Sequence, residues 1–212
     1  MPLGNKILTM LLVLVCSIIL SARNITLTSR TTDKELKCAR KVLVKSDVDL
    51  NGRSIRLAKN SALVFEKGAI TNGTIQLSRT RLEGEVRLLC KVAGTVKNKT
   101  IYANWFVKDN DLDEWMLSGA LSLGGVEEIH FAPSSYVLSV RNKANGISVS
   151  DMLIDGEGCR ITAKQGGRMV YSLLPFSECK NVEIKNFHYA VQKKKGQRHS
   201  RGIIWSYPRV KE

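Results

Sequence analysis

The sequence lacks several features that mark particular classes of protein. It contains no CxxC pair, so the close cysteine spacing of a structural zinc site is missing. Acidic residues are scarce, with 19 Asp and Glu against 33 Lys and Arg, which gives a formal net charge of +14. The longest uncharged apolar run, residues 7–20, is shorter than the roughly 20 residues that a membrane-spanning helix usually needs. The chain is nevertheless long enough, at 212 residues with 43% hydrophobic content, for one domain with a real core.

The amino terminus has the layout of a secretory signal peptide. Lys6 precedes the apolar run over residues 7–20, and small residues then lead to Ala22. We expect residues 1–22 to be a leader that is cleaved near Ala22, with an uncleaved anchor or a lipoprotein as the alternatives. Cys16 is a poor site for lipid attachment because the apolar run continues beyond it. The prediction is an exported protein, located in the periplasm, at the cell surface or outside the cell.

The excess of basic residues predicts a polyanionic partner. Cleavage of the leader would remove only Lys6, so the exported part stays strongly basic. Such a surface attracts polyanions through its long-range field. For an exported chain we expect polysaccharide, lipopolysaccharide or another polyanionic surface, and no specific nucleic acid; membrane contact is expected only through an uncleaved leader. A basic surface that serves solubility alone is the alternative.

Short runs of alternating apolar and polar residues begin at Val48 and predict strands with one buried face. Residues 23–47 are polar and basic, and we interpret them as a lead-in or cap segment. Gly-containing dipeptides separate the runs and allow sharp corners. These dipeptides are Asn51-Gly52, Lys67-Gly68, Asn72-Gly73 and Glu83-Gly84.

The spacing of the runs favours a solenoid over a hairpin meander. Ile55 recurs as Ile75 and Leu63 as Leu82, a period of about 20 residues, which is typical of coils that stack their inward side chains. We therefore predict an all-β fold, a right-handed parallel β-helix, over residues 48–212. We expect this β-helix domain to be either complete or truncated at its carboxyl end.

The same period predicts that two cysteines lie beside each other on successive coils. Cys179 follows Cys159 at this interval, and Ile203-Ile204 follow Ile184 at a similar one. Stacked coils would place the two cysteines side by side, either as a side-chain ladder or as a disulfide. Four cysteines remain after the leader, and spacing alone does not fix a connectivity; they are Cys38, Cys90, Cys159 and Cys179.

A short capping helix is predicted near residues 111–123. Asp111 and Glu114 fit a capping arrangement, and apolar residues fall on one helical face before Gly124. We expect this helix to cover an open end of a coil, with Trp115 and Met116 as packing residues rather than ligand-binding ones. His130, between two apolar strand neighbours, is interpreted as a surface histidine.

Seven short segments follow one another in a characteristic order. They are 49–52 (DLNG), 62–65 (ALVF), 70–75 (ITNGTI), 101–106 (IYANWF), 129–133 (IHFAP), 152–158 (MLIDGEG) and 181–187 (NVEIKNF). In this order they resemble exported right-handed parallel β-helix proteins of the pectate-lyase-like superfamily. The resemblance implies that fold, an aromatic element before the helix, and a relation to polysaccharide lyases or glycoside hydrolases. It implies calcium only by analogy with the family, and the sequence itself indicates no cofactor or metal site.

The chain departs from the family's catalytic patterns. The paired aspartates and Gly-His-Gly segment of polygalacturonase-like enzymes are absent, as is a recognisable lyase set. Glycoside hydrolysis needs two carboxyl groups across the scissile bond. Asp151, Asp155 and Glu157 are the best local candidates, although a turn role for residues 155–158 is the favoured interpretation.

The densest basic segment is the candidate for ligand binding. It is interpreted either as a solvated loop or as a contact for a polyanion, with aromatic rings stacking on sugar faces. The candidate residues are Lys193, Lys194, Lys195, Arg198, Arg201, Trp205 and Tyr207.

The functional hypothesis from the sequence is an exported β-helix protein that binds or processes polysaccharide, with acidic glycans favoured. If the protein is an enzyme, it is a polysaccharide lyase or a glycoside hydrolase. The alternatives are a noncatalytic surface or adhesin-like β-helix protein and a truncated remnant of such an enzyme.

Overall fold

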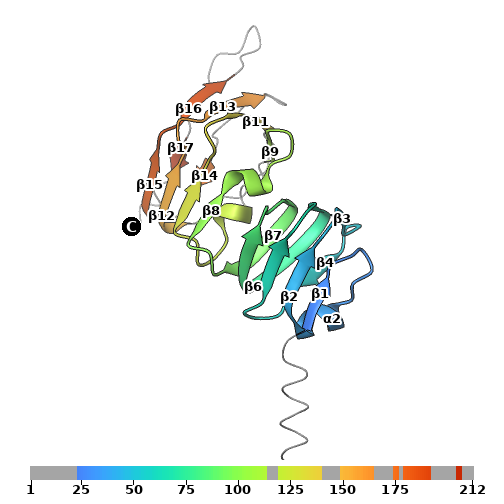
Figure 1. Ribbon diagram of the computed structural model, residues 1–212. Coiled ribbons are helices and arrows are strands. Elements are labelled where there is room, and N and C mark those ends of the chain that lie inside the picture. Colours follow the sequence, from blue (N-terminus) through green and yellow to red (C-terminus); the bar gives the residue numbers. More distant parts are fainter. Residues whose placement is uncertain are drawn as a thin grey trace, which may run out of the picture.

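The chain folds into parallel sheets that stack as a β-solenoid of about six turns (Figure 1). The computed structural model describes residues 23–113, 119–139, 149–164, 174–176, 179–191 and 204–206. This arrangement confirms the predicted all-β parallel β-helix. The predicted leader lies outside the described residues. Within the described part of the chain, no helix has both the length and the apolar character needed to cross a membrane.

The amino-terminal coils form two sheet faces that share the long strand β6 (Ile70–Gly84). One face pairs β1 (Arg23–Thr26), β2 (Ala39–Val44), β5 (Ala62–Phe65) and the last part of β6. The other face pairs β3 (Val48–Asp49) and β4 (Ser54–Arg56) with the earlier part of β6, and β6 with β7 (Leu88–Val96).

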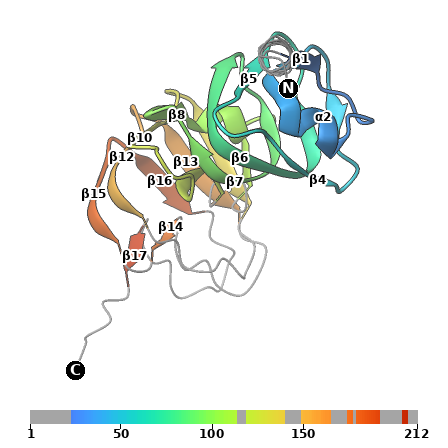
Figure 2. The same ribbon diagram turned by 90° about the horizontal axis from the view of Figure 1, so that it is seen from below.

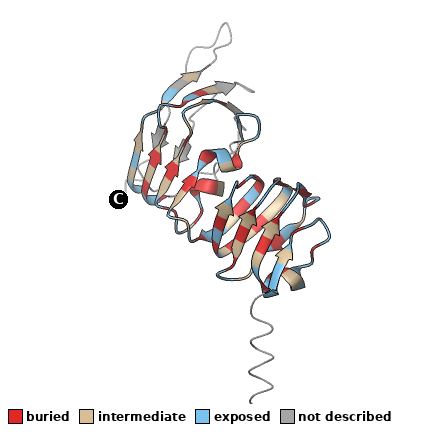
Figure 3. Ribbon diagram, viewed as in Figure 1, coloured by how far each residue is buried: buried red, intermediate tan, exposed pale blue. Residues whose placement is uncertain are grey.

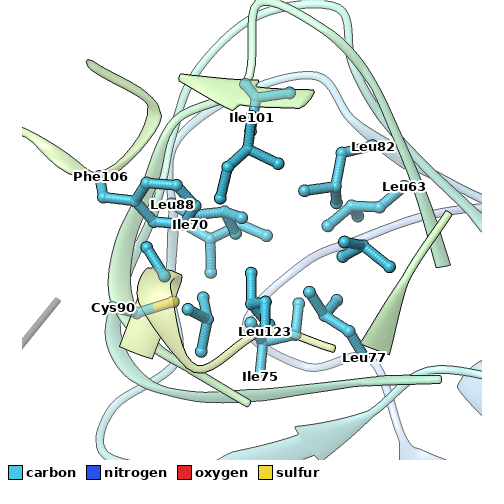
Figure 4. Packing of buried hydrophobic residues seen from close by; sticks show 14 of the residues in the cluster. Leu63, Ile70, Ile75, Leu77, Leu82, Leu88, Cys90, Ile101, Phe106 and Leu123 are labelled. Carbon is cyan, nitrogen blue, oxygen red and sulfur yellow. The ribbon is translucent and has the colours of Figure 1, made fainter. Parts of the chain in front are cut away.

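Inward side chains of successive coils stack into apolar rows, and each row removes its members from water. The predicted recurrences are confirmed, because Ile55 pairs with Ile75 and Leu63 pairs with Leu82. A further row joins Ile70 to its neighbours in β3 and β7. Figure 4 shows Leu63, Ile70, Ile75, Leu82 and Leu88 pointing into a common interior.

The corners use the predicted turn residues. Asn51 and Asn72 have φ values of 51° and 50°, in the left-handed region that asparagine tolerates. Gly84, with a φ of 82°, also lies against the preceding coil, and a Cβ there would collide with the carbonyl oxygen of Phe65. The close stacking of coils therefore requires glycine at this corner.

The segment 23–47, predicted as a lead-in or cap, contributes β1 and β2 to the first sheet face and also forms helix α2 (Asp33–Cys38). Thr32 and Glu35 form a reciprocal capping box at the start of α2. Leu36 of this helix is fully buried, and α2 lies beside β1 and β4 at the amino-terminal end of the solenoid (Figure 2).

The carboxyl-terminal coils build three further parallel sheets. The first pairs β8 (Thr100–Tyr102), β10 (Glu128–His130), β12 (Ser150–Asp155) and β15 (Lys180–Lys185). The second pairs β9 (Asp111–Asp113), β11 (Ser135–Ser139), β13 (Arg160–Lys164) and β16 (His188–Val191). The third pairs β14 (Leu174–Phe176) with β17 (Ile204–Ser206). The 3-10 helix η1 (Ala103–Phe106) follows β8.

Buried residues alternate with partly buried ones in β10 and β12 as well (Figure 3). The inward row of the first sheet consists of Ile101, Ile129, Ile154 and Ile184. Its members are farther apart in the sequence than the repeats of the amino-terminal coils, and their intervals are unequal. The constant period that the sequence predicted for this part of the chain is therefore wrong.

The longer coils also overturn the predicted stacking of two cysteines. Cys159 precedes β13 and its carbonyl accepts a hydrogen bond from the N–H of His188, whereas Cys179 precedes β15 in a different sheet. Ile184 pairs with Ile154, and not with the residues around 204. The thiols of Cys38, Cys90 and Cys159 are free, and those of Cys90 and Cys159 are buried.

The predicted capping helix does not begin at residue 111. Residues 111–113 form β9, because the alternation Asp-Leu-Asp also fits a strand and Leu112 pairs with Leu138. Residues 119–121 are helical, with Ala120 and Leu121 buried. The N–H of Gly124 donates to the carbonyl of Gly94, so the segment after the helix lies along the edge of β7. Trp115 and Met116 lie outside the described residues.

Candidate functional site

Basic side chains are concentrated on three stacked segments of the amino-terminal coils. Segments 54–62, 74–82 and 91–98 contain six Lys and Arg residues and no Asp or Glu. The three segments are stacked in this order because β4 pairs with β6 and β6 pairs with β7. All six basic residues are exposed; they are Arg56, Lys59, Arg79, Arg81, Lys91 and Lys97.

Three of these residues, Lys59, Arg79 and Lys97, lie at the same corner of successive coils, and we name them the basic corner. The N–H of Asn60 donates to the carbonyl of Ser78 over 2.9 Å, which places Lys59 beside the bend of β6. The N–H of Lys97 donates to the carbonyl of Thr80, also over 2.9 Å, in the next coil.

The backbone holds the middle residue of the corner outward. Arg79 has a φ of 50°, and its N–H donates to Oγ1 of Thr95 over 2.8 Å. Neighbouring coils are separated by one strand spacing, about 4.8 Å. The basic corner therefore places exposed positive charge on three successive coils, with Arg81 of the middle coil beside Lys97, an arrangement that suits a linear polyanion.

A second polar surface lies on the outer face of the sheet formed by β8, β10, β12 and β15. Strand register places Tyr102, His130, Asp155 and Lys185 side by side, one from each strand, and we name these four residues the His130 row. Their alignment follows from the inward isoleucine row, since each of the four comes directly after one of those isoleucines.

Two carboxylates hold the His130 imidazole. Its Nδ1 lies 2.7 Å from Oε1 of Glu157, and its Nε2 lies 3.2 Å from Oε2 of Glu128. Desolvation lowers the pKa of His130, but the hydrogen bonds to Glu157 and Glu128 and the charges of these carboxylates outweigh it, so the pKa lies above its ordinary value. Both ring nitrogens can donate only when the ring is protonated, so this geometry favours imidazolium.

Asp155 is fixed as a carboxylate beside this histidine. Its Oδ1 accepts hydrogen bonds from the N–H of Glu157 and from Nδ2 of Asn186, both over 2.9 Å. These bonds, together with Lys185 at 3.7 Å, hold the pKa of Asp155 below its usual range. Asp155 therefore stays ionised near neutral pH and is poorly suited to donate a proton.

The predicted acidic candidates fall into two places. Asp155 and Glu157 are joined at the corner after β12, in the turn arrangement that the sequence favours. Asp151 lies at the other end of β12, where it accepts a hydrogen bond from Nδ2 of Asn181 over 2.7 Å. Among the described residues, no group of three or more His, Cys, Asp and Glu side chains could hold a metal ion.

Two aromatic side chains, Tyr102 and Trp105, lie at one end of the His130 row, and Tyr102 belongs to the row. Tyr102 is 45% exposed, and it is the one large hydrophobic residue among those described that is exposed. Its ring centroid lies 5.5 Å from that of Trp105 and 6.0 Å from that of His130. Trp105, in η1, is partly buried against the core, which anchors this end of the surface.

Most of the predicted ligand-binding residues lie outside the described part of the chain. These are Lys193, Lys194, Lys195, Arg198, Arg201 and Tyr207, and for Trp205 the structure describes only its backbone in β17. The basic corner was not predicted from the sequence, although Lys59 and Arg79 share the spacing of Ile55 and Ile75. The His130 row was not predicted because the varying coil length hides the register of its members.

Comparison with known proteins adds no relative. The chain matches no protein-family model, no curated protein and no solved structure. The fold itself defines the class of this protein, which is the parallel β-helix.

Proposed function

We propose that this chain is an exported, noncatalytic β-helix protein that binds acidic polysaccharide through the basic corner. The supporting observation is that Lys59, Arg79 and Lys97 project from successive coils within segments that contain no acidic residue. Export rests on the predicted leader, and the same leader makes polysaccharide a more accessible polyanion than nucleic acid.

The stacked geometry suits a polymer better than a small anion. Exposed cations lie on three successive coils, which are spaced about 4.8 Å apart, so a polymer that runs along the solenoid axis can contact several of them. Exposed ionic contacts contribute about 0.2–1 kcal/mol each, and therefore affinity requires several of them in line. Such contacts weaken as salt rises, because the screening length falls from about 10 Å at 0.1 M to about 3 Å at 1 M.

Binding without turnover is favoured over catalysis by the state of the acidic candidates. Asp155 has a lowered pKa, which makes it a poor proton donor for glycoside hydrolysis, and the carboxyl group of Glu157 is occupied by its hydrogen bond to His130. Descent from the pectate-lyase-like superfamily, without retained activity, is compatible with this proposal. An adhesin-like surface protein would use the same charges.

A binding assay with two matched variants tests the proposal. The corner variant carries Lys59→Gln, Arg79→Gln and Lys97→Gln; the control variant carries Lys34→Gln, Lys67→Gln and Lys180→Gln, which remove three exposed charges elsewhere. We expect the corner variant to bind polygalacturonate about tenfold more weakly than the control, a difference of about 1.4 kcal/mol.

Three controls accompany the assay. An uncharged glucan polymer should bind the corner variant and the control variant equally, and a single-stranded oligonucleotide tests whether another polyanion is preferred. The assay also records new reducing or unsaturated ends, which should not form. Equal affinity of both variants for polygalacturonate would refute the proposed surface, and efficient cleavage would refute the noncatalytic role.

A further inference from the structure

The His130 row combines an exposed aromatic ring with fixed hydrogen-bonding groups. Tyr102 is 45% exposed, although most large hydrophobic residues of the described chain are buried in the core. Beside its ring, His130 is held by two hydrogen-bonded carboxylates and Asp155 by two N–H donors. The surface is therefore preorganised, so a ligand would lose little affinity to the cost of ordering side chains.

These groups match the chemistry of a pyranose ring. The apolar face of a sugar packs on an aromatic ring, and carboxylate oxygens accept hydrogen bonds from its hydroxyl groups. Each carboxylate has two oxygens, and His130 contacts one oxygen of Glu128 and one of Glu157. The remaining oxygens and the exposed ring of Tyr102 lie on the same outer face of the sheet.

The charge of this surface selects against acidic sugars. Glu128, Asp155, Glu157 and Glu183 supply four carboxylates, against the cations of Lys185 and protonated His130. Two of the carboxylates, Asp155 and Glu183, share the same ammonium group at 3.7 Å. A uronate would meet net negative charge here, whereas an uncharged sugar would not.

We propose that the His130 row is a binding site for an uncharged pyranose unit, stacked on Tyr102 and hydrogen-bonded by Glu128 and Glu157. This site is separate from the basic corner and does not rest on the function proposed above. Its ligand differs from the polyanion in charge, so the two surfaces would contact different saccharides or different units of one mixed polysaccharide.

The test uses neutral hexasaccharides of glucose, mannose and xylose, with hexagalacturonate as the charged comparison. We expect at least one neutral hexasaccharide to bind the wild-type chain, as measured by isothermal titration calorimetry. Tyr102→Ala should weaken that binding about tenfold, and Tyr102→Phe should retain it, because stacking needs the ring and not the hydroxyl.

The variants also separate the two proposals. The corner variant should bind the neutral hexasaccharide as the wild type does, while Glu157→Gln should weaken binding with the fold intact by circular dichroism. If no neutral hexasaccharide binds, or if binding is unaffected by Tyr102→Ala, the site is refuted. Preference of this surface for hexagalacturonate, retained in the corner variant, would refute the charge argument.

Discussion

Asn98 completes a sheet edge with its side chain, and its replacement should destabilise the solenoid. Leu82 of β6 pairs with Leu63 on one side. On the other side its N–H donates to Oδ1 of Asn98 over 2.8 Å, and its carbonyl accepts from Nδ2 over 3.0 Å. The amide thus supplies the donor and acceptor that another strand would supply. Leucine at position 98 has a similar size but offers neither.

The cost follows from the removal of two hydrogen bonds. A typical bond contributes about 0.5–1.5 kcal/mol, and leaving a buried group unsatisfied costs about 1–3 kcal/mol. We expect Asn98→Leu to reduce the free energy of unfolding by about 2–3 kcal/mol. For a chain of this size about 1 kcal/mol corresponds to roughly 2–4 °C in Tm, so the expected fall is about 5–10 °C.

Urea unfolding followed by circular dichroism measures this change. Asn104→Leu is the matched control, because Asn104 is exposed in η1 and such substitutions are usually within about 0.5 kcal/mol of neutral. If Asn98→Leu unfolds at the same urea concentration as Asn104→Leu, the side chain does not complete the sheet edge and the reasoning is wrong.

Three further predictions concern a corner, a histidine and the thiols. Gly156→Ala should reduce the free energy of unfolding by about 1–3 kcal/mol in urea, because a Cβ there would collide with the carbonyl oxygen of Asn186 and lie 2.8 Å from the Phe187 ring. Gly52→Asn is the control, since position 52 is open and its φ of 76° is one that asparagine tolerates. Equal losses of stability in the two variants would contradict the packing argument. The raised pKa of His130 means that its stabilising contribution, about 0.2–1 kcal/mol, is complete below its unfolded pKa of about 6.5 and is lost as pH rises through the folded pKa. His130→Gln should therefore destabilise the chain more at about pH 5.5 than at about pH 8.5 in urea unfolding, and a pH-independent difference from the wild type would contradict this. Burial raises the pKa of Cys90 to about 12. Iodoacetamide at about pH 8 should therefore label exposed Cys38 first and Cys90 only after unfolding, as measured by mass spectrometry of peptides. Early labelling of Cys90 would place it outside the core.

The amino-terminal coils were predictable because the intervals between paired residues stay close to 20, with 17 between Ile75 and Val92 and 22 between Val48 and Ile70. Ile55 and Ile75 occupy equivalent inward positions, and the corner residues Asn51 and Asn72 have the positive φ values expected from their sequence. Buried positions repeat when the same interior must be filled in every coil. Regular sequence spacing and regular spatial stacking then coincide.

The carboxyl-terminal coils separate these two kinds of regularity. Ile129 pairs with Ile154 across one stretch of chain, whereas Ile154 pairs with Ile184 across a longer one. The rows stay regular in space because corner segments of different length lie outside the core. A fixed sequence period therefore misplaces Cys179, and it cannot align Tyr102 with His130.

The candidate surfaces were harder to predict than the core. Outward positions face water, so packing does not constrain their residue type, and no periodic apolar signal marks them. The pairing of Glu157 with His130 also depends on strand register, which sequence spacing did not give. Charge was visible from composition, but its concentration at Lys59, Arg79 and Lys97 became visible only once the coils were stacked.

The salt dependence of polygalacturonate binding tests the central claim most directly. Removing an ionic contact should reduce the slope of log affinity against log salt concentration, as counterion release requires. The corner variant should therefore show a clearly shallower slope than the wild type, while the control variant, with the same net charge, should keep most of the wild-type slope. Equal slopes for the corner and control variants would show that net charge, and not the basic corner, attracts the polysaccharide.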